Sequence, residues 1–287
     1  QQNYRSYQNS KEAPMALYDI IDEITERQAT KTETGDTRMS GVTVGIVANN
    51  FDQSMGGRVC VTIPTRDQNA NELQWARVAM PSGGMAWGHY FLPEVGDQVL
   101  LAFEGGNIEK PYVIGCIQKD TNIFLAQSAD MDNRTKRIVT KHGSSITFDD
   151  SPLDPEGGMD KITIQTAGRQ HTILLDNEGK KIRIADRMGE DYIEMRTEEG
   201  AGSLMIKMRS KVTIQVGESV KLILNGESGS VKLEATQFNV EVDNQFMVKS
   251  NGMIKIESGS ISQKATSAFK IDSGGSVKIA GAPISIG

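Results

Sequence analysis

The sequence has few of the residues that usually carry out chemistry. It contains three histidines and two cysteines among 287 residues, and aromatic residues make up 6% of it. His89, His142 and His171 lie far apart, and none pairs with a second ligand at the spacing of a metal site. No Ser/His/Asp, Cys/His or glycine-rich phosphate motif stands out, and the carboxylates are scattered. We therefore expect no catalytic residue, no metal and no cofactor, and hence no enzyme.

The chain also lacks an excess of positive charge and any long apolar run. Lysine and arginine total 31 against 37 acidic residues, and the net charge of −6 argues against a basic face for nucleic acid. No apolar run approaches the roughly 20 residues needed to span a bilayer. No signal peptide is visible, but the sequence does not begin with Met and is expected to be a processed product or a fragment. Cys60 and Cys116 lie in apolar runs and are expected to be buried, reduced thiols.

What the chain does contain is a series of short apolar runs bounded by glycine and proline. Runs at 41–48 and 58–64 are followed by three more within residues 75–117. Short strands linked by glycine-rich turns predict a small closed barrel such as an OB-fold, which we place at residues 41–118. The predicted fold class is all-β.

Several motifs of this region follow one another in a definite order. They are Trp75-Ala76-Arg77-Val78, Trp87-Gly88, the strand from Pro93 through Gly96 to Phe103, the loop from Gly106-Asn107 to Pro111, and Val113-Ile114-Gly115. In this order they resemble the OB domain of the central spike proteins of contractile injection machines. That family comprises the VgrG spikes of type VI secretion, the baseplate V-type spikes of contractile-tailed phages, and the spikes of tailocins and extracellular injection systems.

An OB-fold raises the separate possibility of a nucleic-acid or sugar site. Trp75 and Trp87 have the chemistry of stacking platforms, but we expect them to pack in the barrel or at its edge. Acidic residues outnumber basic ones in the barrel, so it would gain little of the counterion-release energy that drives nucleic-acid binding. No nucleic-acid partner is expected.

Residues 1–40 are expected to form a polar arm, a short helix and a linker. Apolar residues recur at helical spacing within 14–28, at Leu17, Ile20, Ile21 and Ile24. One short helix cannot bury such a face alone. It would pack either on the barrel of its own chain or on a hub protein or neighbouring protomer, and the sequence favours neither.

Residues 119–137 are expected to be a polar connector. Some phage spikes of the family carry a lysozyme domain at this point, but domains below about 40 residues rarely fold unaided. The resemblance, with this length, implies that the wall-cutting activity is absent. The acidic segment 149–160 lacks the ligand spacing of a calcium loop, so a solvated turn is expected there.

From residue 138 the sequence becomes a repeat in which two apolar residues flank one polar residue. The pairs run from Ile146/Phe148, Ile162/Ile164, Ile173/Leu175, Ile182/Ile184, Ile193/Met195, Ile206/Met208, Val212/Ile214, Leu222/Leu224 and Val231/Leu233 to Phe238/Val240, Phe246/Val248, Ile254/Ile256, Phe269/Ile271, Val277/Ile279 and Ile284/Ile286, with Ile261/Gln263 at the one incomplete position between Ile256 and Phe269. Alternation places each pair on one face of a strand.

Two side chains per strand bury too little area to offset the entropy of ordering the strand. Three chains wound together could point all the pairs at one dry axis and leave no long free sheet edge. We therefore predict a homotrimer, and the resemblance implies an intertwined trimeric β-helical needle over residues 138–287. The predicted needle core includes Val240, Val248, Ile254, Ile256, Ile271 and Ile279.

The resemblance implies a structural, non-catalytic spike that punctures a target envelope. It would be assembled in the bacterial cytoplasm into a tail-like particle, with hub and baseplate proteins on its N-terminal side. An inner tube and effector cargo are further possible partners, and the target membrane would be contacted only on injection. The His-x-His iron tip of some family members is missing, so a PAAR-type tip protein is expected on Pro283, Ile284, Ile286 and Gly287. The alternative is a trimeric fibre with an OB-fold glycan- or nucleic-acid-binding module.

Overall fold

The computed structural model describes residues 21, 24–25, 27, 31, 38–64 and 74–284. Ile21, Ile24, Thr25 and Arg27 are helical, and the Thr25 hydroxyl donates to the Ile21 carbonyl oxygen at 2.7 Å. The rest of the helix predicted over 14–28 lies outside the described residues. The chain forms two compact units, which meet in the sequence between Arg209 and Ser210.

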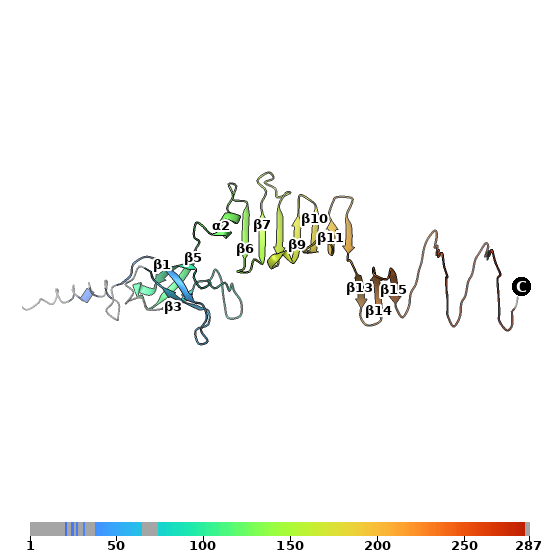
Figure 1. The fold of residues 1–287 in the computed structure, drawn as a ribbon, viewed down its shortest axis with the longest axis horizontal. Coiled ribbons are helices and arrows are strands. Elements are labelled where there is room, and N and C mark those ends of the chain that lie inside the picture. Colours follow the sequence, from blue (N-terminus) through green and yellow to red (C-terminus); the bar gives the residue numbers. More distant parts are fainter. Residues whose placement is uncertain are drawn as a thin grey trace, which may run out of the picture. The chain divides into compact units, whose positions relative to one another are not determined.

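The first unit contains a five-stranded closed barrel (Figure 1). Its strands are β1 (Thr43–Asn49), β2 (Arg58–Thr62), β3 (Gln74–Val78), β4 (Gln98–Phe103) and β5 (Pro111–Ile117). They close in the order β1-β2-β3-β5-β4, with β3 and β5 parallel and the other neighbours antiparallel. The OB-like barrel predicted from the sequence is therefore confirmed.

The barrel closes around a small aliphatic core supplied by alternate strand positions. The core consists of Val47, Val59, Val61, Ile63, Ala76, Val99, Leu101, Ile108 and Val113. Strands β1 and β4 approach so closely that a Cβ on Gly45 would lie 2.6 Å from Leu101 Cδ1. Glycine at position 45 leaves room for the Leu101 side chain, which any larger residue would have to displace.

Two short helical segments were not predicted. A 3-10 turn, η2 (Glu104–Gly106), follows β4, and a helix, α2 (Ile123–Ser128), lies within the segment expected to be a plain polar connector. The side chain of Asn122 caps α2 by accepting from the Phe124 backbone N–H at 2.9 Å. A helix of one or two turns is too short for apolar residues to recur at helical spacing, so the sequence pattern did not indicate α2.

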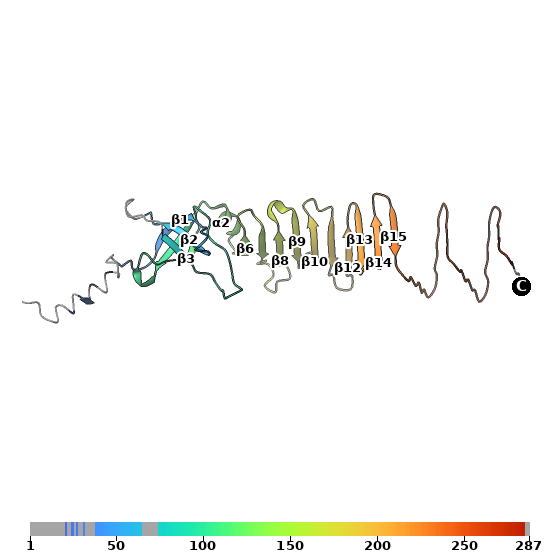
Figure 2. The same ribbon diagram turned by 90° about the horizontal axis from the view of Figure 1, so that it is seen from below.

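The first unit also contains a seven-stranded antiparallel sheet (Figure 2). Its strands are β6 (Thr135–Val139), β7 (Ser145–Asp149), β8 (Lys161–Gln165), β9 (His171–Asp176), β10 (Lys181–Asp186), β11 (Tyr192–Arg196) and β12 (Ser203–Lys207). A second 3-10 turn, η3 (Ala167–Arg169), precedes β9. Each strand pairs with the strand before and after it in the sequence, as in a meander.

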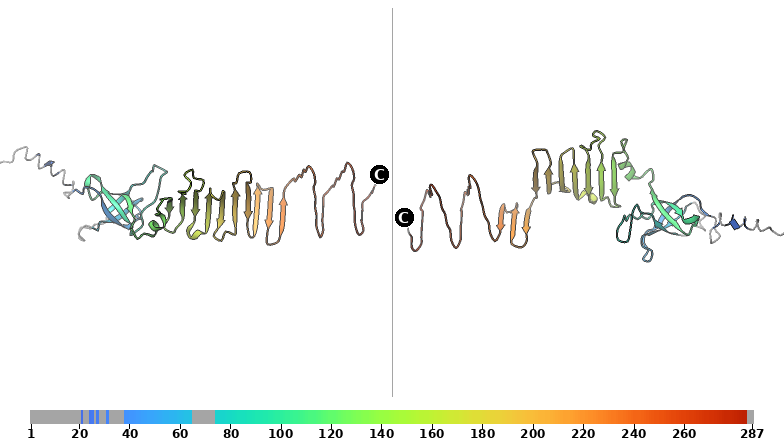
Figure 3. Two further views of the ribbon diagram at one scale, coloured as in Figure 1. Left: turned by 90° about the horizontal axis from the view of Figure 1, so that it is seen from above. Right: turned by 180° about the vertical axis from the view of Figure 1, so that it is seen from behind.

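The second unit begins with a three-stranded antiparallel sheet of β13 (Lys211–Val216), β14 (Val220–Asn225) and β15 (Ser230–Glu234). After β15, residues 235–284 form no helix or strand. Figure 3 shows this part of the chain running back and forth without pairing. No backbone–backbone hydrogen bond forms within 235–284, although the apolar repeat continues there.

Candidate functional site

One face of the seven-stranded sheet carries two continuous apolar rows. Strand pairing aligns the first row as Ile138, Ile146, Ile164, Ile173, Ile184, Ile193 and Ile206. It aligns the second as Phe148, Ile162, Leu175, Ile182, Met195 and Leu204. Such in-register rows are the sheet counterpart of an apolar helix stripe, and they form a surface suited to packing against another layer.

The opposite face of the same sheet is charged, and it satisfies its charges within one chain. Asp176 lies between Lys161 and Lys181, with carboxylate-to-Nζ distances of 3.8 and 3.6 Å, and accepts from the Gly179 N–H at 2.8 Å. The pKa of Lys161 is raised, chiefly by a hydrogen bond to Glu178, with Asp176 adding to the effect. This face therefore needs no partner to neutralise it.

A second charged group on this face is centred on Glu194. Its carboxylate pairs with Arg183 at 3.1 Å and with Arg196 at 2.8 Å. The guanidinium of Arg183 also lies 4.1 Å from the centroid of the Tyr192 ring, a cation–π arrangement. Ion pairs and the aromatic ring thus tie β10 to β11 across the polar side of the sheet.

The exposure of several side chains on the two faces is the reverse of what is usual in a folded protein. The side chain of Glu194 is 12% exposed and Asp176 is 9% exposed, whereas Ile184 on the apolar face is 48% exposed. In folded proteins carboxylates are usually at the surface and isoleucine is usually buried. The apolar face is therefore an uncovered surface in the single chain, far more extended than scattered exposed side chains would be.

The same pattern continues in the second unit. Pairing of β13, β14 and β15 aligns Val212 with Leu224 and Val231, and aligns Ile214 with Leu222 and Leu233. Ile214, Leu233 and Val231 are exposed in the single chain. The short sheet therefore also presents an apolar face that its own chain does not cover.

Beyond β15, the predicted needle-core residues are not brought together by their own chain. Val240, Val248, Ile254, Ile256, Ile271 and Ile279 lie outside strands, with exposures from 48% to 68%. Of the residues predicted to bind a tip protein, Ile284 is exposed and Pro283 is described, whereas Ile286 and Gly287 lie outside the described residues. Both roles stay predictions.

One apolar pair of the repeat was assigned one step too late. Strand β12 ends at Lys207, and its register with β11 places Leu204 opposite Met195 and Ile206 opposite Ile193. The inward pair is therefore Leu204/Ile206 and not Ile206/Met208. Leu204, Ile206 and Met208 all fall on the same alternation, so only the strand pairing shows which two of them lie within the strand.

The residues of the predicted OB-domain motif lie on the outer side of β3, in the buried part of the barrel, or at glycine positions in a turn and in β5. Trp75 and Arg77 lie on β3, on the side away from the core residue Ala76. Pro93 and Pro111 are buried, and Phe103 packs against the core. Gly96 has φ +93° in the turn before β4, and Gly115 lies exposed within β5.

Two expectations about the barrel are wrong. Trp87 is 69% exposed, because it folds back onto its own loop, where a Cβ on Gly84 would lie 2.5 Å from the indole Nε1. Gly88 permits this loop with φ +148°, since a Cβ there would be 2.8 Å from Gly83 Cα. Cys60 is buried as expected, but Cys116 is exposed.

The exposure of Cys116 follows from the pairing of its strand. Strand β3 pairs with β5 only at Tyr112 and Val113, so β3 does not flank the end of β5 that carries Cys116. Burial still raises the pKa of both thiols, and Asp97 adds to the effect at Cys116. Both cysteines are free.

No group of three or more His, Cys, Asp or Glu side chains that could hold a metal ion occurs in the described part of the chain. Within that same part, no helix is both long and apolar enough to cross a membrane.

The barrel and the antiparallel sheets define a mostly β protein with an OB-like domain. Residues 43–117 match the family model of the "Type VI secretion system/phage-baseplate injector OB domain", and the chain carries this domain. The chain is thus a spike-related OB-domain protein with distant similarity to VgrG proteins. Proteins of this family are generally structural.

Three relatives show how low the sequence identity to VgrG proteins is. The type VI secretion system spike protein VgrG3 of Vibrio cholerae is 26% identical over 141 residues, which cover 48% of this chain and 13% of that protein. VgrG1c of Pseudomonas aeruginosa is 24% identical over 112 residues, covering 38% of this chain and 15% of the relative. VgrG5 of the same species is 25% identical over 127 residues, covering 42% and 16%. The chain thus spans less than a fifth of the length of each relative.

Proposed function

We propose that the chain is the structural, non-catalytic central spike of a contractile injection machine and works as a homotrimer. The observation that carries the proposal is the apolar face of β6–β12, where side chains such as Ile184 are more exposed than Glu194 and Asp176 on the charged face. Three copies around a threefold axis would turn these faces toward one another and leave the ion-paired faces in water. A lone chain would leave the apolar rows in water.

Residues 235–284 support the same proposal independently. Their apolar pairs recur every seven or eight residues, but none of their backbone groups pairs with another backbone group of the segment. Neighbouring copies would supply the missing strand partners, and Val240, Val248, Ile254, Ile256, Ile271 and Ile279 would fill the axis. In this arrangement residues 138–287 form a trimeric β-helical needle that follows the barrel at 41–118 and the connector at 119–137.

The proposed mechanism is mechanical. Contraction of a sheath would drive the needle through the target envelope, while hub or baseplate proteins engage the N-terminal side of the trimer, where residues 1–40 lie. A PAAR-type tip protein on Pro283, Ile284, Ile286 and Gly287 and cargo in an inner tube belong to this proposal. The particle would be assembled in the bacterial cytoplasm and would reach the target membrane only on contraction.

Sedimentation equilibrium in the presence of reductant and chelator tests the assembly. We expect three times the mass of one chain without any metal or disulfide, and a stable folded monomer would contradict the proposal. Negative-stain images separate a spike from the alternative fibre. A stiff tapering rod is expected for a spike, whereas a globular head at the C-terminal end would favour the fibre.

A further inference from the structure

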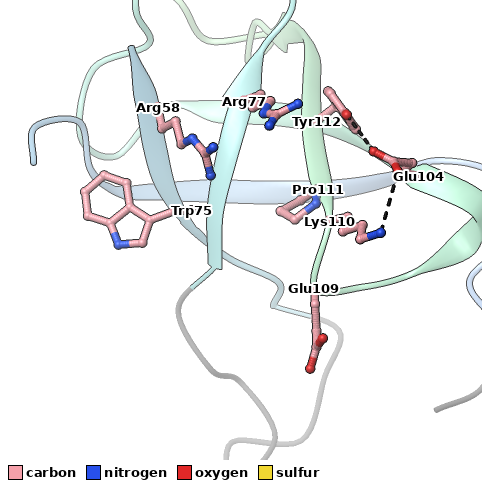
Figure 4. Close-up of a pocket in the computed structure, with 8 residues that line it drawn as sticks. All are labelled: Arg58, Trp75, Arg77, Glu104, Glu109, Lys110, Pro111 and Tyr112. Atoms are coloured by element: carbon pink, nitrogen blue, oxygen red, sulfur yellow. Dashed lines mark hydrogen bonds and ion pairs between the residues drawn. The ribbon is translucent and has the colours of Figure 1, made fainter. Parts of the chain in front are cut away.

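The outside of the barrel carries a groove of about 340 Å³ that crosses β2, β3 and β5. Arg58, Arg77 and Tyr112 come from the three strands, with Trp75 at one end and Lys110 and Glu104 at the other (Figure 4). We call it the twin-arginine groove. All its residues belong to one chain and one barrel, so the groove does not depend on the proposed trimer.

The two arginines lie directly opposite each other. Arg58 on β2 pairs in register with Arg77 on β3, so two guanidinium groups share one face of the sheet. Neither forms an ion pair with a described residue. Like charges at directly opposed strand positions destabilise a sheet. The arrangement therefore lowers the stability of the barrel unless an anion is bound between the arginines.

The Glu104 carboxylate of the groove is already engaged by Tyr112 and Lys110. Glu104 Oε2 accepts from the Tyr112 hydroxyl at 2.7 Å, and Glu104 Oε1 lies 3.6 Å from Lys110 Nζ. The Tyr112 hydrogen bond, followed by the charges of Lys110 and Arg77, holds the pKa of Glu104 below its usual range. Glu104 is thus ionised and fixed at the rim, and the hydrogen-bond donors of Arg58 are left for a ligand.

We propose that the twin-arginine groove binds an aspartate or glutamate side chain presented by an acidic segment of a partner protein. The planar guanidinium forks match a carboxylate, and two adjacent forks can hold both of its oxygens. Trp75 offers an apolar wall for the residue beside the acid. Glu104 and Glu109 at the rim, in a chain of net charge −6, repel extended polyanions such as nucleic acid.

Fluorescence of Trp75 provides a direct test in the chain of 287 residues. Trp87→Phe leaves Trp75 as the single tryptophan, because the sequence contains two. The probe is the blocked peptide acetyl-Gly-Glu-Glu-Leu-Gly-amide, and the matched control peptide has glutamine in place of both glutamates. We expect a saturable change in fluorescence with the glutamate peptide and none with the glutamine peptide.

Substitutions in the groove should then weaken binding of the glutamate peptide selectively. Arg58→Gln and Arg77→Gln should each raise the dissociation constant by about tenfold or more, because each removes charge-assisted hydrogen bonds. Lys119→Gln removes one positive charge outside the groove and should leave the constant unchanged. Arg77→Gln should also melt no lower than the parent protein, since it relieves the repulsion from Arg58.

Each other outcome would overturn the proposal. Equal binding of both peptides, or unaltered binding after either arginine substitution, would show that the arginines do not bind the carboxylate. Competition by inorganic phosphate or by an oligothymidylate at the peptide's own concentration would indicate an anion or nucleic-acid site instead. If a glutamine variant does not fold, Arg77→Lys retains the charge but removes the fork, and undiminished binding by that variant contradicts the proposal.

Discussion

The seven-stranded sheet β6–β12 and the segment 235–284 carry the same apolar repeat but differ in their backbone hydrogen bonding. In the sheet, every strand pairs with its neighbours in the sequence, and apolar pairs recur every 9 to 11 residues from Ile162 to Ile193. In 235–284 the pairs recur every seven or eight residues, and the backbone forms no internal ladder.

The repeat length explains part of this difference. The strands of the sheet are five or six residues long, and four residues separate β9 from β10. With strands of this length, a repeat of seven or eight residues would leave only one to three residues for each turn, which within one chain requires special turn residues. The shorter repeat therefore favours strands whose partners come from other copies. In the proposed trimer, the chain would therefore change from pairing with itself to pairing with its neighbours while retaining one apolar pattern.

The largest effect is expected from a charge in the segment without internal pairing. Ile254→Asp would place three carboxylates on the proposed dry axis, and each buried, unpaired charge costs several kcal/mol. We expect loss of the trimer in sedimentation or a collapse of its melting temperature. Lys255→Asp, one residue along and on the opposite face, should be nearly silent. Equal effects from both variants would show that the strand faces are wrongly assigned.

A charge on the apolar face of the sheet should have the next largest effect. Ile164 is partly exposed in the single chain, where an aspartate would cost little, but it would be dry in the assembly. We expect Ile164→Asp to lower the melting temperature of the trimer strongly, with Thr163→Asp on the charged face as the matched control. A mild effect at both positions would mean that nothing covers the apolar face.

A substitution in the barrel should change the stability of the barrel without affecting the sheet β6–β12 or the segment 235–284. A Cβ at position 45 would lie 2.6 Å from Leu101 Cδ1, so Gly45→Ala should destabilise the barrel by about 1–3 kcal/mol. Gly115→Ala meets no atom within 4 Å and is the control. Denaturant unfolding followed by Trp75 fluorescence should show the loss for Gly45→Ala alone, with the trimer intact.

The smallest effect is expected at the end of the first unit. Arg209 pairs with Asp191 at 2.7 Å and with Glu190 at 2.6 Å, which ties the residue after β12 to the β10–β11 turn. Its hydrogen bonds hold the pKa of Asp191 below the usual value. A depressed carboxyl pKa stabilises the fold above the unfolded pKa of about 3.9, and this contribution is lost as the pH falls through the folded value.

Arg209→Gln should accordingly melt slightly lower than the parent protein at neutral pH. The difference should shrink as the pH falls below about 3.9 and Asp191 becomes protonated in the parent protein. Calorimetric scans at neutral and acid pH provide the comparison. A difference that grows in acid would contradict the assigned role of this ion pair.

The sequence allowed the barrel and most of the repeat to be predicted because both depend on strict alternation. Inward positions such as Val99 and Leu101, or Ile182 and Ile184, are separated by one residue, so the geometry of a strand places both of them on the same face. The position of Trp87 depends on how Gly84 and Gly88 fold one loop, which alternation does not encode.

The groove on the barrel was missed for a different reason. Arg77 was noticed as part of a motif, but its neighbour Arg58 lies in another strand, and only the register of β2 and β3 places the two opposite each other. A search for like charges at equivalent positions of adjacent predicted strands could have found the pair. The pattern of one chain also does not show what covers the apolar faces, because in the proposed trimer they would be covered by other copies of the molecule.

Hydrogen exchange of the amides in 235–284 tests the central claim most directly. A segment with no backbone–backbone hydrogen bonds of its own should exchange within seconds if each chain is alone. The account predicts protection comparable to that of β8–β11 in the native assembly, because neighbouring copies pair with this backbone. Rapid exchange across 235–284 in protein that sediments as a folded species would contradict it.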